Sequence, residues 1–520
     1  MRRLCHMTNR LCLALACVLL AVRLPSLVQP MGADQGLYAY VGERVLHGGL
    51  PYRDAWDQKP PAIHVAYAAM RAAWPKAAAV PGADLALAAL TAFLLWRLGT
   101  LLAAPTVGQL AALLFLFLSN PSFARLGGVS VRAQCETFIA AAVTGAFVLL
   151  AGSRHKPAGW RFAAAGVLFG IAFTFKYNAA VYAGAGLAAL LLWNRLTRTA
   201  VVAMAAGFLL PVAGFLAWFA VGHAVRALYD ATITYNLRYS GQTYAGPVHA
   251  VTYLLTFPVR HARVDALWLV GGAGCAVLLA AALRGRDRLV PVAWVAAACL
   301  SIAINGSRDL PQYFIQAGPA LALAAAWAGS LLWTRWRIVN LAAVALVAVG
   351  VWRVNDFSKL ADNTWHDARY AVGRSSRTDH LARYGDRTMR KYSALAMSEL
   401  AAELDRRAAP NEPVFVFGFS SGAYVEAGRV SASRFFWSRP VIAGFNAGRP
   451  GYGVSGLLED LRRHPPAVVA LQQRDWYPDV DDSAHFFMSS LPLAGWLRAS
   501  YEPVQGPAGF DLWVRRQEPR

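Results

Sequence analysis

The sequence predicts an α-helical polytopic membrane protein with a C-terminal soluble α/β domain. Of its 520 residues, 57% are hydrophobic and 15% are charged, and the mean hydropathy of +0.37 is too high for an ordinary soluble domain. Residues 1–353 hold 29 Lys and Arg against 10 Asp and Glu, whereas residues 354–520 hold 21 against 19. The chain therefore divides into an apolar, basic membrane domain, 1–353, and a soluble domain of balanced charge, 354–520.

A membrane span needs about 20 apolar residues, and on this measure we expect about eleven spans. The first is an uncleaved span over residues 11–29 rather than a signal peptide, with Arg23 extending to the interface. The other ten are expected at 84–103, 106–120, 134–152, 162–179, 180–193, 199–221, 264–283, 289–304, 315–333 and 338–352.

Basic residues cluster in every second connection between these spans, which by the positive-inside rule places those connections in the cytoplasm. The clusters are Arg2/Arg3/Arg10, Arg154/Lys156/Arg161, Arg195/Arg198, Arg284/Arg286/Arg288 and Arg335/Arg337. This predicts a multi-pass protein of the inner membrane whose loops 30–83, 222–263 and 305–314 and C-terminal domain are periplasmic. A nucleic-acid partner is not predicted, because such proteins gather basic residues on one soluble face.

The C-terminal domain has the pattern of a small α/β fold. A helical periodicity runs over residues 393–407, and short apolar runs at 413–417 and 467–471 predict buried strands. The glycines between residues 418 and 428 have neither the GxGxxG nor the GxxxxGK spacing. We therefore interpret that segment as a strand-to-helix connection, and not as a nucleotide site.

Candidate chemistry is concentrated in the first periplasmic loop, residues 30–83. Four of the ten acidic residues of the membrane domain lie between residues 30 and 61. Residues 35–47 predict a short surface helix that begins after Asp34, and residues 62–74 predict a second one. An inert connection would not hold so many of the domain's carboxylates.

Several motifs follow in a recognisable order: Asp34, then Gly48-x-x-Pro51-Tyr52, Asp57-x-Lys59-Pro60-Pro61, Glu136, residues 166–176, and Arg308-x-x-x-Gln312-Tyr313-Phe314. This order resembles glycosyltransferase family 39 and its relatives, over roughly residues 10–352. They are GT-C enzymes and include protein O-mannosyltransferases and lipid A aminoarabinose transferases.

The resemblance implies a GT-C glycosyltransferase. Such an enzyme would transfer a sugar, with inversion, from a polyprenyl-phosphate donor in the membrane to an envelope acceptor: lipopolysaccharide, another glycan or a protein. It implies that Asp34 is the general base and that Lys59 and Arg308 bind the donor phosphate. Asp57, Glu136 and Tyr313 are further candidate site residues.

The chain departs from the family pattern at two positions. Many members have an acidic pair where this chain has Asp34–Gln35, and the position of Gln312 is often His. The first departure weakens the case for a metal held by two adjacent carboxylates. No metal ligands are predicted and no cofactor is required, although a divalent cation stays open.

The chemistry that the resemblance implies needs one carboxylate. A polyprenyl phosphate leaves as a stable anion and needs no acid to protonate it, unlike the leaving group in glycoside hydrolysis. One base must accept the acceptor's hydroxyl proton, and cations must offset the charge that grows on the phosphate.

Two of the loop residues also have structural interpretations. Asp34 stands where a helix N-cap is expected, and a capping aspartate would have the same sequence pattern. Asp57 could form an ion pair with Lys59 or with Arg53. Both interpretations remain open from the sequence.

Glu136 could be an interfacial charge at the start of a span, and Arg308 a surface residue beside Asp309. For the whole protein, the alternative function is a transporter or flippase of an envelope lipid or glycan. A transporter is expected to hold ionisable residues within its spans, and here Lys176 is the main example. A non-catalytic envelope scaffold is a third possibility.

Overall fold

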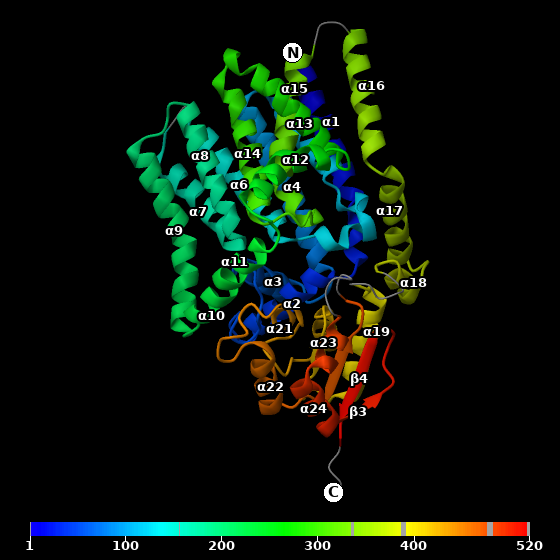
Figure 1. Ribbon diagram of the computed structural model, residues 1–520. Coiled ribbons are helices and arrows are strands. Elements are labelled where there is room, and N and C mark those ends of the chain that lie inside the picture. The colour runs from blue at the N-terminus through cyan, green and yellow to red at the C-terminus, as the bar shows by residue number, and fades with distance from the viewer. Residues whose placement is uncertain (1, 155–156, 334–336, 386–391, 476–481, 517–520) are drawn as a thin grey trace. The chain divides into compact units, whose positions relative to one another are not determined.

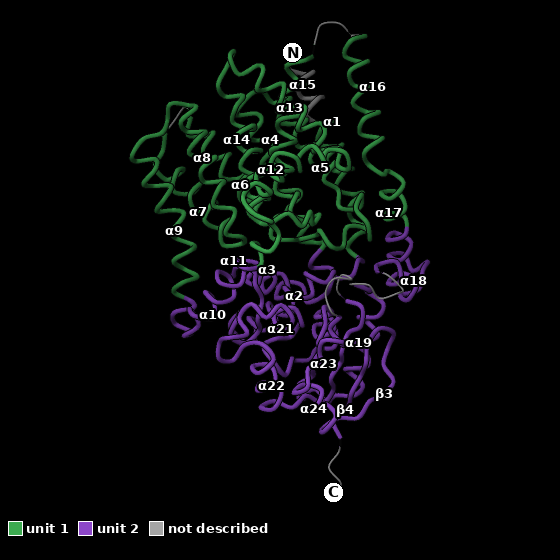
Figure 2. The backbone as a smooth tube through the Cα atoms, viewed as in Figure 1, with its two compact units in different colours: residues 1–27, 81–217, 239–365 green, residues 28–80, 218–238, 366–520 purple. Residues whose placement is uncertain are grey.

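The computed structural model describes residues 2–154, 157–333, 337–385, 392–475 and 482–516, and it forms two compact units (Figure 2). Unit 1 comprises residues 1–27, 81–217 and 239–365, and unit 2 comprises residues 28–80, 218–238 and 366–520. Lys156 and Arg335, from two of the predicted cytoplasmic clusters, lie outside the described residues. The predicted domain boundary at residue 353 is a division along the sequence and stays a prediction.

Long apolar helices make up unit 1 (Figure 1). Every predicted span coincides with a helix, and these are α1 (Arg2–Ala21), α4 (Ala79–Leu102), α5 (Pro105–Leu118), α6 (Cys135–Gly152), α7 (Gly159–Phe175), α8 (Val181–Leu192), α9 (Arg198–Val221), α13 (Ala266–Ala280), α14 (Leu289–Ile304), α15 (Gly318–Leu332) and α16 (Arg337–Val354). The polytopic helical fold is thus confirmed.

The number of spans stays a prediction. Among the described residues, seven helices are long and apolar enough to cross a membrane, or up to nine if two bent pairs each count as one span. One pair joins α12 (Pro247–His261) to α13 at 112°, and the other joins α16 to α17 (Phe357–Ala371) at 64°. Reaching eleven requires α7 and α8, which are shorter.

Glycines let α7 and α9 pack at close range. A Cβ atom on Gly166 would lie 2.1 Å from the Met204 carbonyl oxygen, and one on Gly170 would lie 2.3 Å from that of Phe208. Small residues four apart allow membrane helices this approach. Part of the motif at residues 166–176 is therefore explained by packing.

Arg23 does not extend to the interface as expected. Its side chain is 2% exposed, and Nη2 donates to the Leu116 carbonyl oxygen at 2.5 Å and to Ser119 Oγ at 3.1 Å. The residue follows the end of α1, where the chain turns into the 3-10 helix η1 (Leu24–Val28). The expectation was wrong because α5 offers acceptors inside the unit.

Unit 2 contains the small α/β fold predicted for the C-terminal part of the chain. Its strands are β1 (Phe415–Phe417), β2 (Val468–Gln472), β3 (Tyr501–Val504) and β4 (Phe510–Arg515), in the sheet order β1-β2-β4-β3. The two predicted strands, β1 and β2, pair in parallel with Val416 opposite Ala470, and both are fully buried. The two C-terminal strands add antiparallel.

Helices surround this sheet in sequence order. They are α18 (Arg377–Ala382), α19 (Ala394–Arg407), α20 (Gly422–Ala427), α21 (Arg439–Ala443), α22 (Gly453–Arg463), α23 (Ser483–Ser489) and α24 (Leu491–Ser500). The predicted helix at 393–407 is α19, and Ser393 caps it by accepting from the Ala396 amide. The glycine segment connects β1 to α20, which ends at Gly428 in the left-handed conformation (φ 62°). It is a strand-to-helix connection, as predicted.

The first loop belongs to the same unit as the C-terminal domain. The Trp56 amide donates to the Arg434 carbonyl oxygen at 2.8 Å, and Trp437 Nε1 donates to the Trp56 carbonyl oxygen at 3.0 Å. The Ser431 amide donates to the Tyr40 hydroxyl at 2.9 Å. The loop that holds the predicted catalytic residues is therefore held by the C-terminal residues.

Candidate active site

Asp34 lies in the first turn of α2 (Ala33–Leu46) and its side chain is partly exposed. The N-cap of this helix is Gly32, and no side chain caps it. The N-cap interpretation of Asp34 is therefore wrong. A carboxylate in the first turn is favoured by the helix dipole, which helps to keep it ionised. Asp34 also has interactions with its surroundings in unit 2.

A second helix, α3 (Ala62–Ala73), packs along α2 and confirms the other helix predicted in the loop. Tyr38 and Tyr67 meet edge to face with ring centroids 5.4 Å apart. Arg71 donates to Glu43 at 2.6 Å, so Glu43 pairs across the two helices. These contacts give the N-terminal turn of α2 a fixed support within unit 2.

The connection between α2 and α3 is ordered by its own hydrogen bonds. Tyr52 has a left-handed backbone (φ 70°), its amide donates to the Ala55 carbonyl oxygen, and its hydroxyl donates to the Lys59 carbonyl oxygen at 2.7 Å. Arg53 binds Asp54 at 2.8 Å, so the proposed pairing of Arg53 with Asp57 is wrong. The Tyr52 contact fixes the backbone at Lys59, whose side chain is partly exposed.

Asp57 is buried, with 1% of its surface exposed, and lies beside His64, which is fully buried. Nε2 of His64 is 3.5 Å from Oδ2 of Asp57. Asp57 Oδ1 accepts from the Gln58 amide at 2.7 Å, whereas Oδ2 and both ring nitrogens of His64 have no hydrogen-bond partner among the described residues. Three buried polar atoms thus face each other without satisfied hydrogen bonds, which is uncommon outside functional sites.

The electrostatics of this pair connect it to Asp34 and Lys59. Burial raises the pKa of the Asp57 carboxyl to about 6; the Lys59 ammonium opposes this rise and the Asp34 carboxylate adds to it. Burial lowers the pKa of His64 to about 3. Asp34, Asp57 and Lys59 therefore lie within electrostatic reach of one another, beside a neutral histidine.

The start of α2 is packed against the C-terminal domain through two glycines. A Cβ atom on Gly36 would lie 2.7 Å from the Gly422 amide nitrogen and 2.9 Å from its Cα. Real Cβ atoms do not come this close to backbone, so neither helix could hold its position with a side chain at Gly36. Gly36 is two residues from Asp34, and the contact with α20 therefore sets the position of the candidate base.

The other three candidates lie in unit 1. Glu136 is in the first turn of α6, 1% exposed, and forms an ion pair with Lys176, which is 5% exposed. The Lys176 ammonium also lies 4.5 Å from the centre of the Tyr313 ring. Glu136 is thus a buried, paired group, and its interpretation as an interfacial charge is wrong.

Arg308 is part-buried and stacks on Tyr239, with its guanidinium carbon 3.6 Å from the ring centre. Its Nη2 donates to the Tyr239 carbonyl oxygen at 2.6 Å, and Nη1 is buried without a hydrogen-bond partner among the described residues. Asp309 instead binds the Tyr253 hydroxyl at 2.7 Å. Arg308 is therefore a stacked, oriented side chain, and not a surface arginine paired with its neighbour.

The sequence analysis missed His64 as a site residue and Lys176 as the partner of Glu136. A histidine in an apolar helix gives no sequence signal of burial against a carboxylate, and residues 136 and 176 are too far apart for spacing to connect them. Among the described residues, no three His, Cys, Asp or Glu side chains are grouped to hold a metal ion. The residues around Asp34 therefore do not fit such a metal centre.

Comparison with known proteins identifies the fold. No protein-family model and no curated protein matches the sequence. Among solved structures, ArnT from Cupriavidus metallidurans bound to undecaprenyl phosphate is similar with a TM-score of 0.60 and 16% identity, over 97% of each chain. ArnT in the apo state gives 0.57 and 18%, over 98% of each chain.

An oligosaccharyltransferase from Archaeoglobus fulgidus, in complex with Zn and sulfate, is similar with a TM-score of 0.51 and 13% identity, over 96% of this chain and 73% of the other. These neighbours are GT-C glycosyltransferases. The chain therefore has a GT-C-type polytopic fold over nearly its whole length, which confirms the fold that the motifs predicted. At such identities the similarity concerns the fold, and the activity is argued from the site.

Proposed function

We propose that this protein is a membrane glycosyltransferase that moves a sugar from a polyprenyl-phosphate donor to an envelope acceptor. The observation that carries the proposal is the placement of Asp34: it is a partly exposed carboxylate in a helix first turn, beside Lys59 and a buried acid, in a chain with a GT-C-type fold. ArnT, which has the same fold, was captured with undecaprenyl phosphate.

In the proposed reaction, Asp34 accepts the proton of the acceptor hydroxyl. The hydroxyl oxygen forms a bond to the anomeric carbon as the bond from that carbon to the phosphate oxygen breaks, so the configuration inverts and the polyprenyl phosphate leaves as an anion. One carboxylate is sufficient because the leaving group needs no proton. Asp57 holds its proton more tightly than an ordinary aspartate and is less suited to be the base.

Cations are needed where the phosphate gains charge. Lys59 is our first candidate, because its backbone is fixed by Tyr52 and its side chain is partly exposed. Arg308 is the second, because its stacked guanidinium keeps Nη1 without a hydrogen-bond partner among the described residues. A planar guanidinium binds phosphate oxygens well when it is held in orientation. Tyr313 and Glu136 would act through Lys176, which both contact.

The C-terminal domain is proposed to position the loop and to help select the acceptor. Its contacts with Tyr40, Trp56 and Gly36 support the first role. Lipopolysaccharide, another envelope glycan and a protein are the acceptor classes that the proposal includes.

A transporter or flippase is the second candidate function, and the ion pair in unit 1 argues against it. Lys176 was the main ionisable residue expected within a span, and it is neutralised by Glu136. Transport sites need charges that can exchange partners with a substrate or ion. We therefore favour the enzyme.

We place the protein in the inner membrane with the C-terminal domain in the periplasm, on the basis of the basic clusters. A reporter that is active only in the periplasm should work when fused after Asn355 and stay silent when fused after Arg286. The reverse pattern would contradict the outer-face location of the reaction.

The experiment that tests the function compares the envelope of a deletion strain with that of its parent by mass spectrometry of lipids, glycans and glycoproteins. We expect one class of molecule to lose the mass of a single sugar, and the loss to be restored by the wild-type gene. Envelopes that are identical under conditions of proven expression would contradict the proposal.

A further inference from the structure

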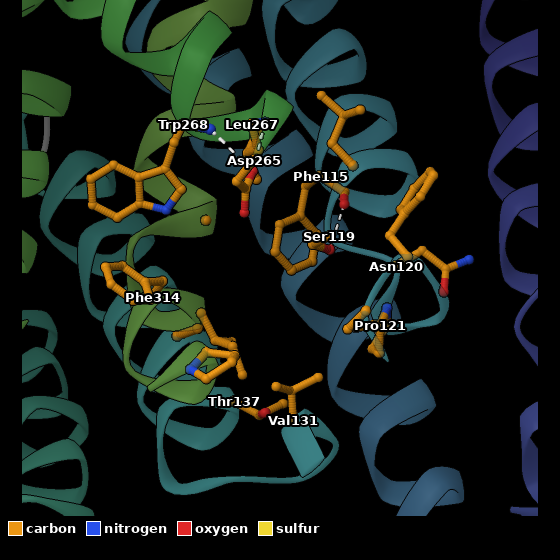
Figure 3. Close-up of a pocket in the computed structure, with 18 of the residues that line it drawn as sticks. Phe115, Ser119, Asn120, Pro121, Val131, Thr137, Asp265, Leu267, Trp268 and Phe314 are labelled. Carbon is orange, nitrogen blue, oxygen red and sulfur yellow. Dashed lines mark hydrogen bonds between the residues drawn. The ribbon is translucent and has the colours of Figure 1, made fainter. Parts of the chain in front are cut away.

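Unit 1 contains a cavity of about 370 Å³ to which the proposed reaction assigns no role (Figure 3). Helices α4, α5, α6, α13 and α15 contribute to its wall. Much of the lining is apolar or aromatic, and Phe115, Trp268 and Phe314 are prominent in it. A volume of this size matches small-ligand sites and is much larger than a packing defect.

Arginine gives this apolar cavity an unusual charge. Arg23 and Arg125 both line it, and neither has a carboxylate within 4.0 Å in the part of the chain that the structure describes. Arg125 is exposed, whereas Arg23 is 2% exposed and its Nε has no hydrogen-bond partner among those residues. A buried cation without a counter-charge is costly, and a bound anion would offset that cost.

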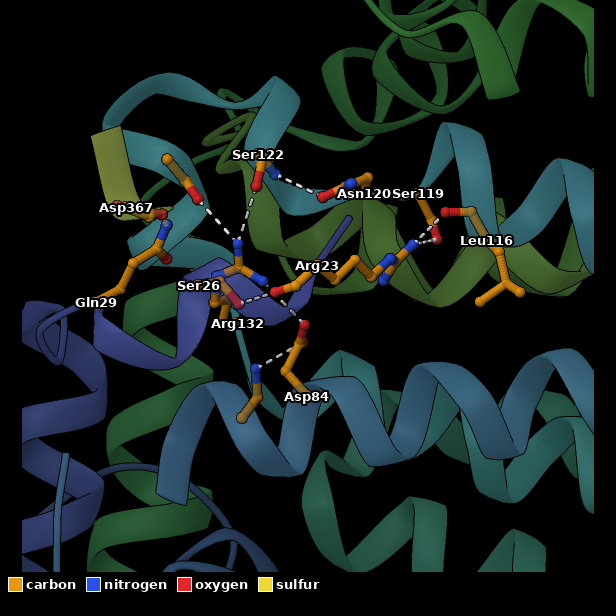
Figure 4. A network of polar contacts seen from close by, with 12 residues as sticks. Arg23, Ser26, Gln29, Asp84, Leu116, Ser119, Asn120, Ser122, Arg132 and Asp367 are labelled. Carbon is orange, nitrogen blue, oxygen red and sulfur yellow. Dashed lines mark hydrogen bonds and ion pairs between the residues drawn. The ribbon is translucent and has the colours of Figure 1, made fainter. Parts of the chain in front are cut away.

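The acidic groups near the cavity are already engaged (Figure 4). Asp84 pairs with Arg132 at 3.4 Å and accepts from the Ala133 amide at 3.1 Å. Asp265 caps α13 by accepting from the Leu267 amide at 2.8 Å, and its other oxygen lies 3.7 Å from His261. The buried group of Arg23, Arg132 and Asp84 thus has two positive charges and one negative charge.

We propose that this cavity binds the phosphate-bearing head of a lipid. The two arginines would bind the anionic head, while Phe115, Trp268 and Phe314 would contact the first carbons of the chains. Arginine suits phosphate because its donors match the phosphate oxygens. An inorganic anion would gain nothing from the aromatic wall, and an uncharged lipid would leave Arg23 uncompensated. The proposal does not rest on the glycosyl-transfer function, because it concerns binding alone.

Two matched variants on one helix test the site. Gly318, at the start of α15, lines the cavity in a helical conformation, and a Cβ there would lie 3.5 Å from the Phe115 ring in ordinary contact. Gly318→Val therefore fills the cavity without removing a charge. Gly329, on the same helix, has no atom within 4 Å of the position that a Cβ would take, so Gly329→Val is the control for the substitution itself.

Binding is measured by native mass spectrometry of the full-length protein in detergent, with dioctanoyl phosphatidic acid as the probe. Dioctanoylglycerol supplies the same chains without phosphate, and inorganic phosphate supplies the head alone. We expect saturable binding of phosphatidic acid by the wild type and Gly329→Val, at least tenfold weaker binding by Gly318→Val and by Arg23→Gln, and little binding of dioctanoylglycerol.

Several outcomes would overturn the proposal. Equal binding of phosphatidic acid and dioctanoylglycerol would show that the phosphate is not recognised. Inorganic phosphate that competes at the same concentration as the lipid would identify an anion site without a lipid component. Unchanged binding by a folded Gly318→Val protein would place the lipid elsewhere, and this variant keeps the test valid if Arg23→Gln does not fold.

Discussion

His64 and Asp57 face each other inside unit 2, with Nε2 of the imidazole 3.5 Å from Oδ2 of the carboxyl and both side chains at most 1% exposed. Neither atom has a hydrogen-bond partner among the described residues. Because burial raises the pKa of Asp57 to about 6 and lowers that of His64 to about 3, the pair is mainly uncharged near pH 5 and Asp57 ionises towards neutrality. The neighbourhood of Asp34 is therefore sensitive to pH.

The first prediction concerns this pH dependence. The pKa of Asp57 is higher in the folded protein than its usual value of 3.8, so the proton it keeps stabilises the fold fully below about pH 4, and that stabilisation is lost as the pH rises through about 6. The difference corresponds to about 3 kcal/mol. Relative to Asp57→Asn, the wild type should lose thermal stability between pH 4 and pH 8.

Melting curves of both purified proteins at four pH values check this prediction. His64 is present in both proteins, so its opposite effect, a loss of stability below about pH 6, largely cancels in the comparison. A difference in Tm that stays constant from pH 4 to pH 8 would show that Asp57 is not a strained buried acid.

The second prediction concerns the contact of Gly36 with Gly422. Gly36→Ala places a methyl group against backbone that has no side chain to move aside, and overpacking of this kind costs about 1–3 kcal/mol. Gly422→Ala meets the flexible Met397 side chain first, with the Cβ 2.5 Å from Sδ. We therefore expect Gly36→Ala to lower both Tm and turnover, and Gly422→Ala to be milder.

Gly184→Ala in α8 is the control, because nothing lies within 4 Å of its Cβ position and alanine is the better helix former. It should leave Tm unchanged or raise it. If Gly36→Ala behaves in the same way as this control, the contact with α20 does not position the first turn of α2.

The third prediction concerns Glu136 and Lys176. Removing one partner leaves the other as a buried unpaired charge, so Lys176→Met and Glu136→Gln should each destabilise the protein by about 3–5 kcal/mol. The double variant should recover most of this loss. Melting of the four proteins forms a double-mutant cycle. Additive losses in the double variant would contradict the buried pair.

The membrane helices could be predicted from the sequence, because their apolar character is local and continuous. Asp34 and Lys59 could be singled out because they are clustered with other polar residues in one short loop. His64 could not, because its partner is found only after α3 folds back along the connection. Arg23 was misjudged for a similar reason: its acceptors on α5 are almost a hundred residues away, and local sequence offered only the interface.

The C-terminal contacts were also beyond sequence reasoning. The predicted helix 393–407 and both predicted strands formed as expected, since each follows from local periodicity. Nothing local connects Trp56 to Trp437 or Gly36 to Gly422, because these contacts depend on the tertiary packing of two distant segments. Alanine or glycine at such positions is uninformative until the neighbouring backbone is known.

The most direct test of the central claim is the turnover of Asp34→Asn, measured in membranes as release of the lipid phosphate at matched protein levels. Asparagine preserves the shape of the side chain but cannot accept the acceptor's proton, so turnover should fall by a factor of about 10²–10⁴ while donor binding is largely kept. Asp405→Asn, at an exposed carboxylate of the same unit, is the control. Near-normal turnover by a folded Asp34→Asn protein would contradict the account.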